Sequence, residues 1–359
     1  MSTKNTAGAA VQENKMGVLP VGKLLAGMAI PMMISMLVQA LYNVVDSIFV
    51  AQLSEDALNA VSLAFPLQNL MIAFGGGTAV GINALLSRSL GEKKQDMADK
   101  AANTGIFLSL CNFVVFALIG IFFSRTFFQL QAGGEEVIVE YGTQYATICL
   151  GCSVGIFSQF CFERLLQSTG RTVHTMITQS IGAIINIILD PILIHGWFGL
   201  PAMGIAGAAL ATCISSWLGP VLILLFSLFE KNLLIGPIRE LTAFGLKNLG
   251  AFYRRAMPVV FNEGMWALGI LIVNMIYSNI GYEYYAGMTI FKTFADLAFA
   301  FYVGLGNSCV IMVGKSIGSG KIRRGVEDAR RFSVLIPLLG MVIGGLVILF
   351  RYPLISIFS

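Results

Sequence analysis

Five polar residues stand inside long apolar stretches of this sequence: Asn43, Asp46, Asn186, Asp190 and Thr212. Asn43 and Asp46 are three residues apart, and Asn186 and Asp190 are four apart, so each pair lies on one face of a helix. Carboxylate, amide and hydroxyl oxygens are hard ligands that suit a proton or a hard cation such as Na⁺. Ionisable groups in apolar helices usually mark an ion or substrate pathway. We therefore expect these five residues to form a proton or cation site.

The helices that must hold these residues are apolar enough to lie in a lipid bilayer. Hydrophobic residues make up 56% of the 359-residue chain and charged residues only 12%, about half the share of charge in soluble domains. Many apolar blocks exceed the roughly 18 residues that a spanning helix needs. The sequence predicts an all-α polytopic membrane protein with nine spans, at residues 24–51, 58–87, 101–124, 138–162, 176–198, 204–229, 256–281, 284–313 and 332–351.

The connections between spans indicate the orientation. Lys and Arg gather in every second connection, at Arg88–Lys100, Arg164–Arg171, Lys231–Arg255 and Lys315–Arg331. The positive-inside rule then places the N-terminus in the cytoplasm, with a disordered tail at residues 1–20, and we expect the protein in the bacterial cytoplasmic membrane. The net charge of +4 follows from this topology. It gives no reason to invoke a nucleic-acid partner.

This topology brings three of the polar residues to one depth. Asp46 lies about five residues, roughly 8 Å, below the outer boundary of its span. Asp190 and Thr212 each lie about eight residues below the same boundary. Pro191 has no N–H, so the carbonyl of Ile187 loses its helical partner and adds an oxygen to the group. We expect helix bends at Pro31 and Pro191.

The sequence also contains an internal repeat. Ala29–Pro31 ("AIP") recurs as Ala256–Pro258 ("AMP"), an offset of 227 residues, and the same offset pairs "RSLGEKK" at Arg88–Lys94 with "KSIGSGK" at Lys315–Lys321. Six predicted spans separate the copies, so both enter the membrane in the same direction. Such a parallel repeat about an axis along the membrane normal is an architecture of secondary transporters.

The repeat predicts two lobes of unequal length. We divide the chain into the tail, a six-helix lobe at residues 21–230, a cytoplasmic linker at 231–255 and an incomplete three-helix lobe at 256–359. A full second copy would need three more helices. Without them the second lobe would expose polar faces to lipid, so we expect this chain by itself to be unable to transport.

Four motifs together resemble the multidrug and toxic compound extrusion (MATE) transporters. They are "LYNVVDSIFVAQLSEDALNAVSLAFP" in the first span, "SRSLGEKK" after the second, "NIILDP" in the fifth and "GIAGAALATCIS" in the sixth. The resemblance implies twelve helices in two lobes, and a monomeric antiporter that exports small organic, often cationic, compounds against H⁺ or Na⁺ without a cofactor. Asp46 and Asn186/Asp190 occupy the acidic positions typical of the DinF-like branch.

The second lobe offers further candidates for a substrate or ion site in Glu263, Lys292 and Asp296. Lys292 and Asp296 stand four residues apart and could instead neutralise each other as a structural pair. Two alternative functions remain open. A lipid-intermediate flippase of the same superfamily would line its cavity with arginine, which we place in no span interior. An intramembrane aspartyl protease would carry a Gly-x-Gly-Asp motif, which neither Asp46 nor Asp190 has.

Overall fold

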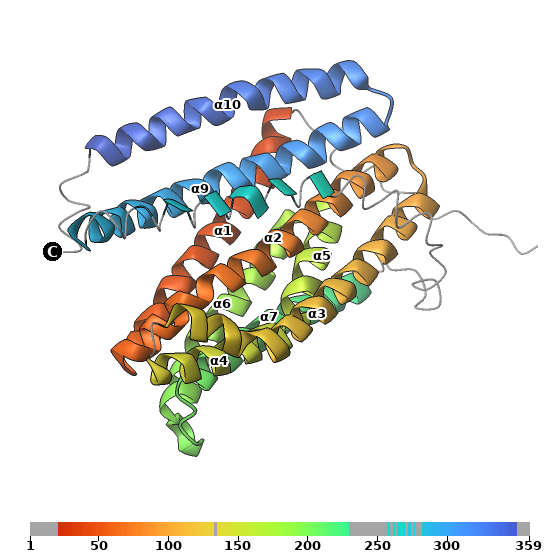
Figure 1. The fold of residues 1–359 in the computed structure, drawn as a ribbon. Helices are drawn as coiled ribbons and strands as arrows, with labels where there is room; N and C mark the ends of the chain where they lie inside the picture. The colour runs from red at the N-terminus through yellow and green to blue at the C-terminus, as the bar shows by residue number, and fades with distance from the viewer. Residues whose placement is uncertain are drawn as a thin grey trace, which may run out of the picture.

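The computed structural model describes residues 21–132, 135–229 and 282–349, together with scattered residues between 257 and 276, and the described residues form helices without a strand. The helices are α1 (Val21–Ala51), α2 (Glu55–Gly91), α3 (Gln95–Gln131), α4 (Glu136–Gly151), α5 (Val154–Ser168), α6 (Thr172–His195), the short 3₁₀ helix η2 (Trp197–Gly199), α7 (Ile205–Phe229), α9 (Tyr282–Gly318) and α10 (Ile322–Leu349). Figure 1 shows α1 to α7 as one bundle, with α9 and α10 along one side.

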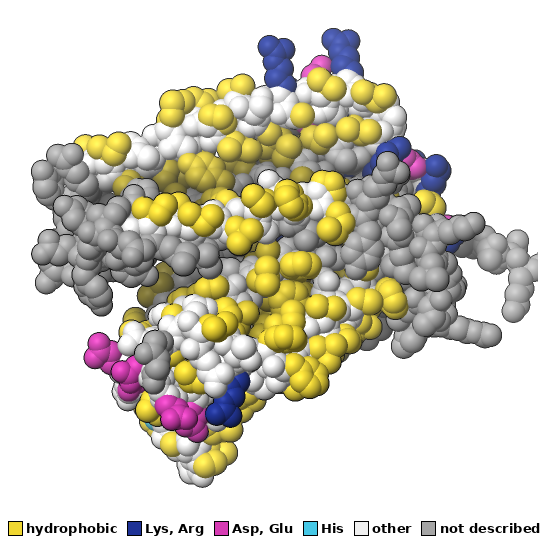
Figure 2. All heavy atoms as spheres, in the orientation of Figure 1, with side chains coloured by type: hydrophobic (Ala, Val, Ile, Leu, Met, Phe, Trp, Pro, Cys, Tyr) yellow, Lys and Arg dark blue, Asp and Glu magenta, His cyan; other side chains and the backbone are white. Residues whose placement is uncertain are grey.

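Seven described helices are long and apolar enough to cross a membrane, or eight spans if α4 and α5 count as one. They correspond to eight of the nine predicted spans, which confirms the all-α membrane fold. The remaining prediction, residues 256–281, lies largely outside the described residues. In Figure 2 the visible Lys, Arg, Asp and Glu side chains gather at the ends of the helices, while the middle of the surface is apolar. We call the end that carries Arg88 and Lys315 the basic end, and the end that carries Glu55 and Glu136 the acidic end.

The helices extend beyond the apolar blocks at the basic end. α2 runs to Gly91, α3 already begins at Gln95, and Lys93 makes the turn between them with a positive φ of 56°. The first turns of α3 remain helical because Ala98, Ala101 and Ala102 are buried on one side while the charged side chains point outward. Small buried residues on one face and charged residues on the other are the pattern of an amphipathic helix.

The fourth predicted span needs a correction. The structure breaks it into α4 and α5, bent by 43° around Cys152 and Ser153. α5 then continues to Ser168, so Arg164 lies in a helix and is 5% exposed, where the sequence analysis placed it in a connection. The buried helix tolerates the arginine because its Nη1 donates to the side-chain oxygen of Gln167 at 2.6 Å.

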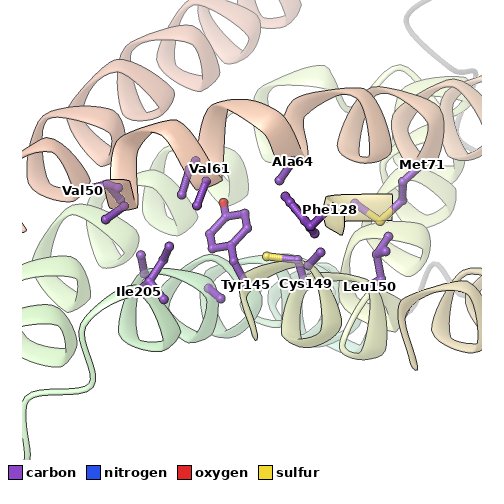
Figure 3. Packing of buried hydrophobic residues seen from close by; sticks show 14 of the residues in the cluster. Val50, Val61, Ala64, Met71, Phe128, Tyr145, Cys149, Leu150 and Ile205 are labelled. Carbon is purple, nitrogen blue, oxygen red and sulfur yellow. The ribbon is translucent and has the colours of Figure 1, made fainter. Parts of the chain in front are cut away.

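The bundle packs around a hydrophobic core that joins α2, α3, α4, α5 and α7. Its largest members are Phe128, Tyr145 and Phe157, all at most 2% exposed. Figure 3 shows the hydroxyl of Tyr145 on α4 pointing toward α2, with Cys149 beside it on the same helix. All six cysteines of the chain are free, in keeping with the thiols expected of apolar helices. The core therefore fixes α4 against α2 at the level where α1 carries its acidic residue.

α9 connects the second repeat to the first. It packs along α1 and α2, and α10 packs along α9. A second, smaller core lies at this junction and contains Met28 and Met32 of α1, Leu305 and Met312 of α9, and Phe332 of α10. α10 otherwise remains exposed on most of its length, for example at Met341 and Val342.

Candidate ion-binding site

The polar centre of the bundle is on α6. Asn186 and Asp190 lie four residues apart, on one helical face, and both side chains are 0% exposed. Both oxygens of Asp190 and both polar atoms of Asn186 are buried without a hydrogen-bond partner among the described residues. Pro191 continues the helix but offers no N–H to the carbonyl of Ile187. Buried polar groups are normally paired, so this unpaired set is a candidate position for a bound ion or proton.

Asp46 on α1 completes a pair of carboxylates. α1 packs along the length of α6, and near the basic end the Thr172 hydroxyl donates to the carbonyl of Gly27 at 3.2 Å. Asp46 and Asp190 are close enough to interact electrostatically, and Oδ1 of Asp46 is buried without a partner among the described residues. Two carboxylates in an apolar interior repel each other and are costly to keep charged together. A proton or a cation between them removes that repulsion.

The two other predicted members occupy different surroundings. Thr212 lies on α7, which packs on α6, and its hydroxyl oxygen is buried without a hydrogen-bond partner in the described part of the chain. α7 comes close to α6 because Gly207 lies against the backbone of Leu193 and Ile194. Asn43, by contrast, is exposed. The structure thus places Asn43 at the edge of the site rather than in its buried centre.

Two tyrosines join the carboxylates, and the sequence analysis did not select them. Tyr42 interacts electrostatically with both Asp46 and Asp190, and Tyr145 of α4 interacts with Asp46. The hydroxyl of Tyr145 also accepts a hydrogen bond from Nε2 of Gln68 at 3.1 Å. Tyr42 could have been found by its position four residues before Asp46, on the same helical face. Tyr145 could not, because only the packing of α4 brings it to this place.

The candidates of the second lobe remain predictions. Glu263 lies outside the described residues. Lys292 and Asp296 lie within α9, but their side chains are also outside the described part. The predicted bend at Pro31 falls within the continuous helix α1, where its carbonyl accepts a hydrogen bond from the hydroxyl of Ser35 at 2.9 Å.

The candidate ligand atoms at the site are side-chain oxygens. Asp46, Asn186, Asp190 and Thr212 present buried, unpaired oxygens from three helices. Among the described residues, no three His, Cys, Asp or Glu side chains gather as they would around a transition metal. Oxygen ligands on hard, partly anionic groups fit Na⁺ or a proton. The residues present therefore fit the ion that the sequence predicts.

Comparisons with known proteins agree with this architecture. The family model MatE matches residues 31–192 and 258–359. The chain is 27% identical over 338 residues to "Probable multidrug resistance protein YoeA" of Bacillus subtilis, and the match covers 92% of this chain and 72% of that protein. It is 25% identical over 343 residues to "Probable multidrug resistance protein NorM" of Thermotoga maritima, and the match covers 94% of this chain and 72% of that protein.

Solved structures show the same fold. The crystal structure of a MATE protein in complex with MaL6 superposes with a TM-score of 0.87 at 23% identity and covers 97% of this chain and 76% of that one. A MATE transporter in an outward-facing conformation gives a TM-score of 0.84 at 24% identity, and the match covers 97% of this chain and 76% of that one. These relatives and structural neighbours are transporters, not enzymes, which removes the protease alternative. The chain therefore belongs to the MatE family of multi-pass membrane transporters.

Proposed function

We propose that the protein is a secondary antiporter that exports small organic compounds, cationic or amphiphilic, in exchange for H⁺ or Na⁺. The observation that carries the proposal is the pair Asp46 and Asp190, on α1 and α6, which interact electrostatically and carry buried, unpaired oxygens. The relatives named above as multidrug resistance proteins support the export of organic compounds. The positive-inside rule supports a cytoplasmic N-terminus with the basic end inside.

The coupling step follows from the charge of the pair. When the acidic end is open to the outside, H⁺ or Na⁺ enters and neutralises the carboxylates. Neutralisation weakens the attraction for a cationic substrate, so that the substrate leaves to the outside. When the site later faces the cytoplasm, the ion leaves and the charged pair again attracts a cation. The ion gradient thus drives export because the same two carboxylates serve both ligands in turn.

The test replaces each carboxylate by the nearly isosteric amide. In the chain extended by the three further helices that the repeat predicts, Asp46→Asn and Asp190→Asn should each abolish gradient-driven efflux of a fluorescent organic cation from proteoliposomes, because Asn carries no charge for the ion to neutralise. Imposing a pH gradient and a Na⁺ gradient separately identifies the ion. The matched control is Asp56→Asn, which makes the same change on an exposed residue at the start of α2. If both site variants exported at the wild-type rate under either gradient while the control did so too, the two carboxylates would be structural.

A further inference from the structure

The basic ends of α2 and α9 meet at two glycines. A Cβ atom added to Gly91 would collide with the carbonyl oxygen of Lys315 and would lie 3.0 Å from the backbone nitrogen of Ser319. A Cβ added to Gly318 would collide with the carbonyl oxygen of Arg88 and would lie 3.0 Å from the carbonyl carbon behind it. The obstacles are backbone atoms, which cannot rotate away as a side chain can. The two helices therefore touch backbone to backbone at this end.

The residues in this contact are equivalent positions of the internal repeat. The offset of 227 residues relates Gly91 to Gly318, and it also relates Ser87 to Gly314. A Cβ at Gly314 would lie 3.2 Å from the Cβ of Ser87. Each helix thus carries two small residues four apart and packs them on the matching pair of the other helix. Such small-xxx-small pairs allow close approach of helices in membranes. We call these four residues the glycine contact, and its reciprocity places it on the axis that relates the two repeats.

The interface between the repeats is closed at the basic end and uncovered toward the acidic end. On α1, Met33 packs against α9 at Gly304. Val44 follows eleven residues later, about three helical turns, and so lies on the same face of α1. It is nevertheless 48% exposed. Figure 1 agrees, because α2 and α9 converge toward their C-terminal ends and diverge toward the opposite ends. Asp46 lies two residues beyond Val44 on α1, in the same part of that helix.

We propose that the glycine contact is the gate that closes the basic end of the transport path and that it separates once in every cycle. This inference rests on the proposed antiport, in which the site must open to each side in turn. In the conformation described, the path between the repeats is blocked where the two backbones touch. A substrate that enters from the basic end can pass only after α2 and α9 move apart. Gly91 and Gly318 make the closed state possible, because any larger residue at either position would hold the helices apart.

A reversible cross-link tests the gate directly. The distance of 3.2 Å between the two Cβ positions is slightly below the roughly 3.5–4.5 Å of disulfides, so Ser87→Cys together with Gly314→Cys should cross-link on mild oxidation. The cross-linked protein should lose efflux by about tenfold or more, as expected when one of two required states is removed, and a reductant should restore it. The single variants, oxidised in the same way, control for the six native thiols. If the cross-linked protein exported at the rate of the reduced protein, the contact would be a fixed packing point and the proposal would be wrong.

A second experiment does not depend on transport. Gly91→Ala should hold the basic end open and shift the protein to the state in which the acidic end is closed. A cysteine at Val44 (Val44→Cys) reports that shift when a membrane-impermeant thiol reagent is added outside. In the Gly91→Ala protein, the reaction of this cysteine with the reagent should be slower by about tenfold. The matched control is Gly76→Ala on the same helix, where an added Cβ meets nothing within 4 Å.

The two experiments separate the gate from the proposed function. If the reduced double-cysteine variant and the wild type, both extended by the three further helices that the repeat predicts, fail to export, the antiport proposal is wrong. The labelling experiment still decides whether the contact opens and closes. Equal labelling of Val44→Cys in the Gly91→Ala and Gly76→Ala proteins would contradict the gate, even if efflux were intact.

Discussion

Replacing Gly207 by alanine should damage the ion site without changing any of its ligands. Gly207 is at the start of α7, where an added Cβ would lie 2.5 Å from the carbonyl carbon and oxygen of Leu193 and 2.8 Å from the nitrogen of Ile194. Ordinary contacts between heavy atoms require about 3.5 Å. Because these obstacles belong to the backbone of α6, α7 would have to retreat by about 1 Å. Overpacking of this kind destabilises a protein by about 1–3 kcal/mol.

The same displacement should have a larger effect on transport. Thr212 lies on α7 and Asp190 on α6, so a retreat of α7 changes the distance between two ligands of the site. A misplacement of about 1 Å at a site that requires defined geometry can cost on the order of 100-fold in rate. We therefore expect a modest loss of thermal stability in detergent together with a large loss of ion-driven efflux in proteoliposomes.

The matched control is Gly182→Ala, in the same interface between α6 and α7. There the added Cβ would meet only the carbonyl oxygen of Ser215, at 3.4 Å, which is close to an ordinary contact. Gly182→Ala should keep most of its efflux and stability. If the variants at Gly207 and Gly182 behaved alike in both assays, the reasoning that links the α6–α7 distance to the ion site would be refuted.

Two further substitutions test the packing of the bundle. Glu163 is 2% exposed and accepts hydrogen bonds from Gln159 at 2.9 Å and Gln179 at 2.7 Å, so Glu163→Leu leaves two amides unpaired and should destabilise the protein by about 2–4 kcal/mol. Thermal unfolding in detergent measures this loss, and Glu163→Gln, which keeps an acceptor, should lose clearly less. Ser54 caps α2 by accepting from the N–H of Ala57 at 3.0 Å, so Ser54→Ala should destabilise by about 1 kcal/mol. An unchanged midpoint of unfolding would show that the cap contributes nothing.

Local patterns in the sequence predicted the helices well. Each spanning helix must satisfy its own backbone hydrogen bonds, so length and hydropathy suffice to recognise it. The helix ends were less predictable. α3 begins at Gln95 because buried alanines on one face stabilise turns whose other face is charged. α5 continues to Ser168 because all of Glu163–Ser168 are buried, the polar residues included. Hydropathy alone detects neither kind of burial.

The residues of the candidate ion site were recognisable in part for the same reason. Asp46 and Asp190 were recognisable because a carboxylate in an apolar helix is rare and costly. Tyr145 was not, since tyrosine is common in apolar helices and nothing in its neighbourhood marks it as polar. Its place near Asp46 depends on the packing of α4 against α2, and its partner Gln68 is 77 residues away in the chain.

The sequence by itself determined that this protein is helical, lies in a membrane, contains a repeat and carries acidic residues within its apolar helices. These properties depend on composition, periodicity and offsets along one chain. The tertiary structure decided which side chains meet: that Asp46 and Asp190 interact electrostatically, that Asn43 remains exposed, and that Gly91 and Gly318 touch across the repeat. Contacts between helices depend on crossing distances set by small residues on both partners at once. No single segment of the sequence contains that information, because each distance belongs to a pair of helices that only folding brings together.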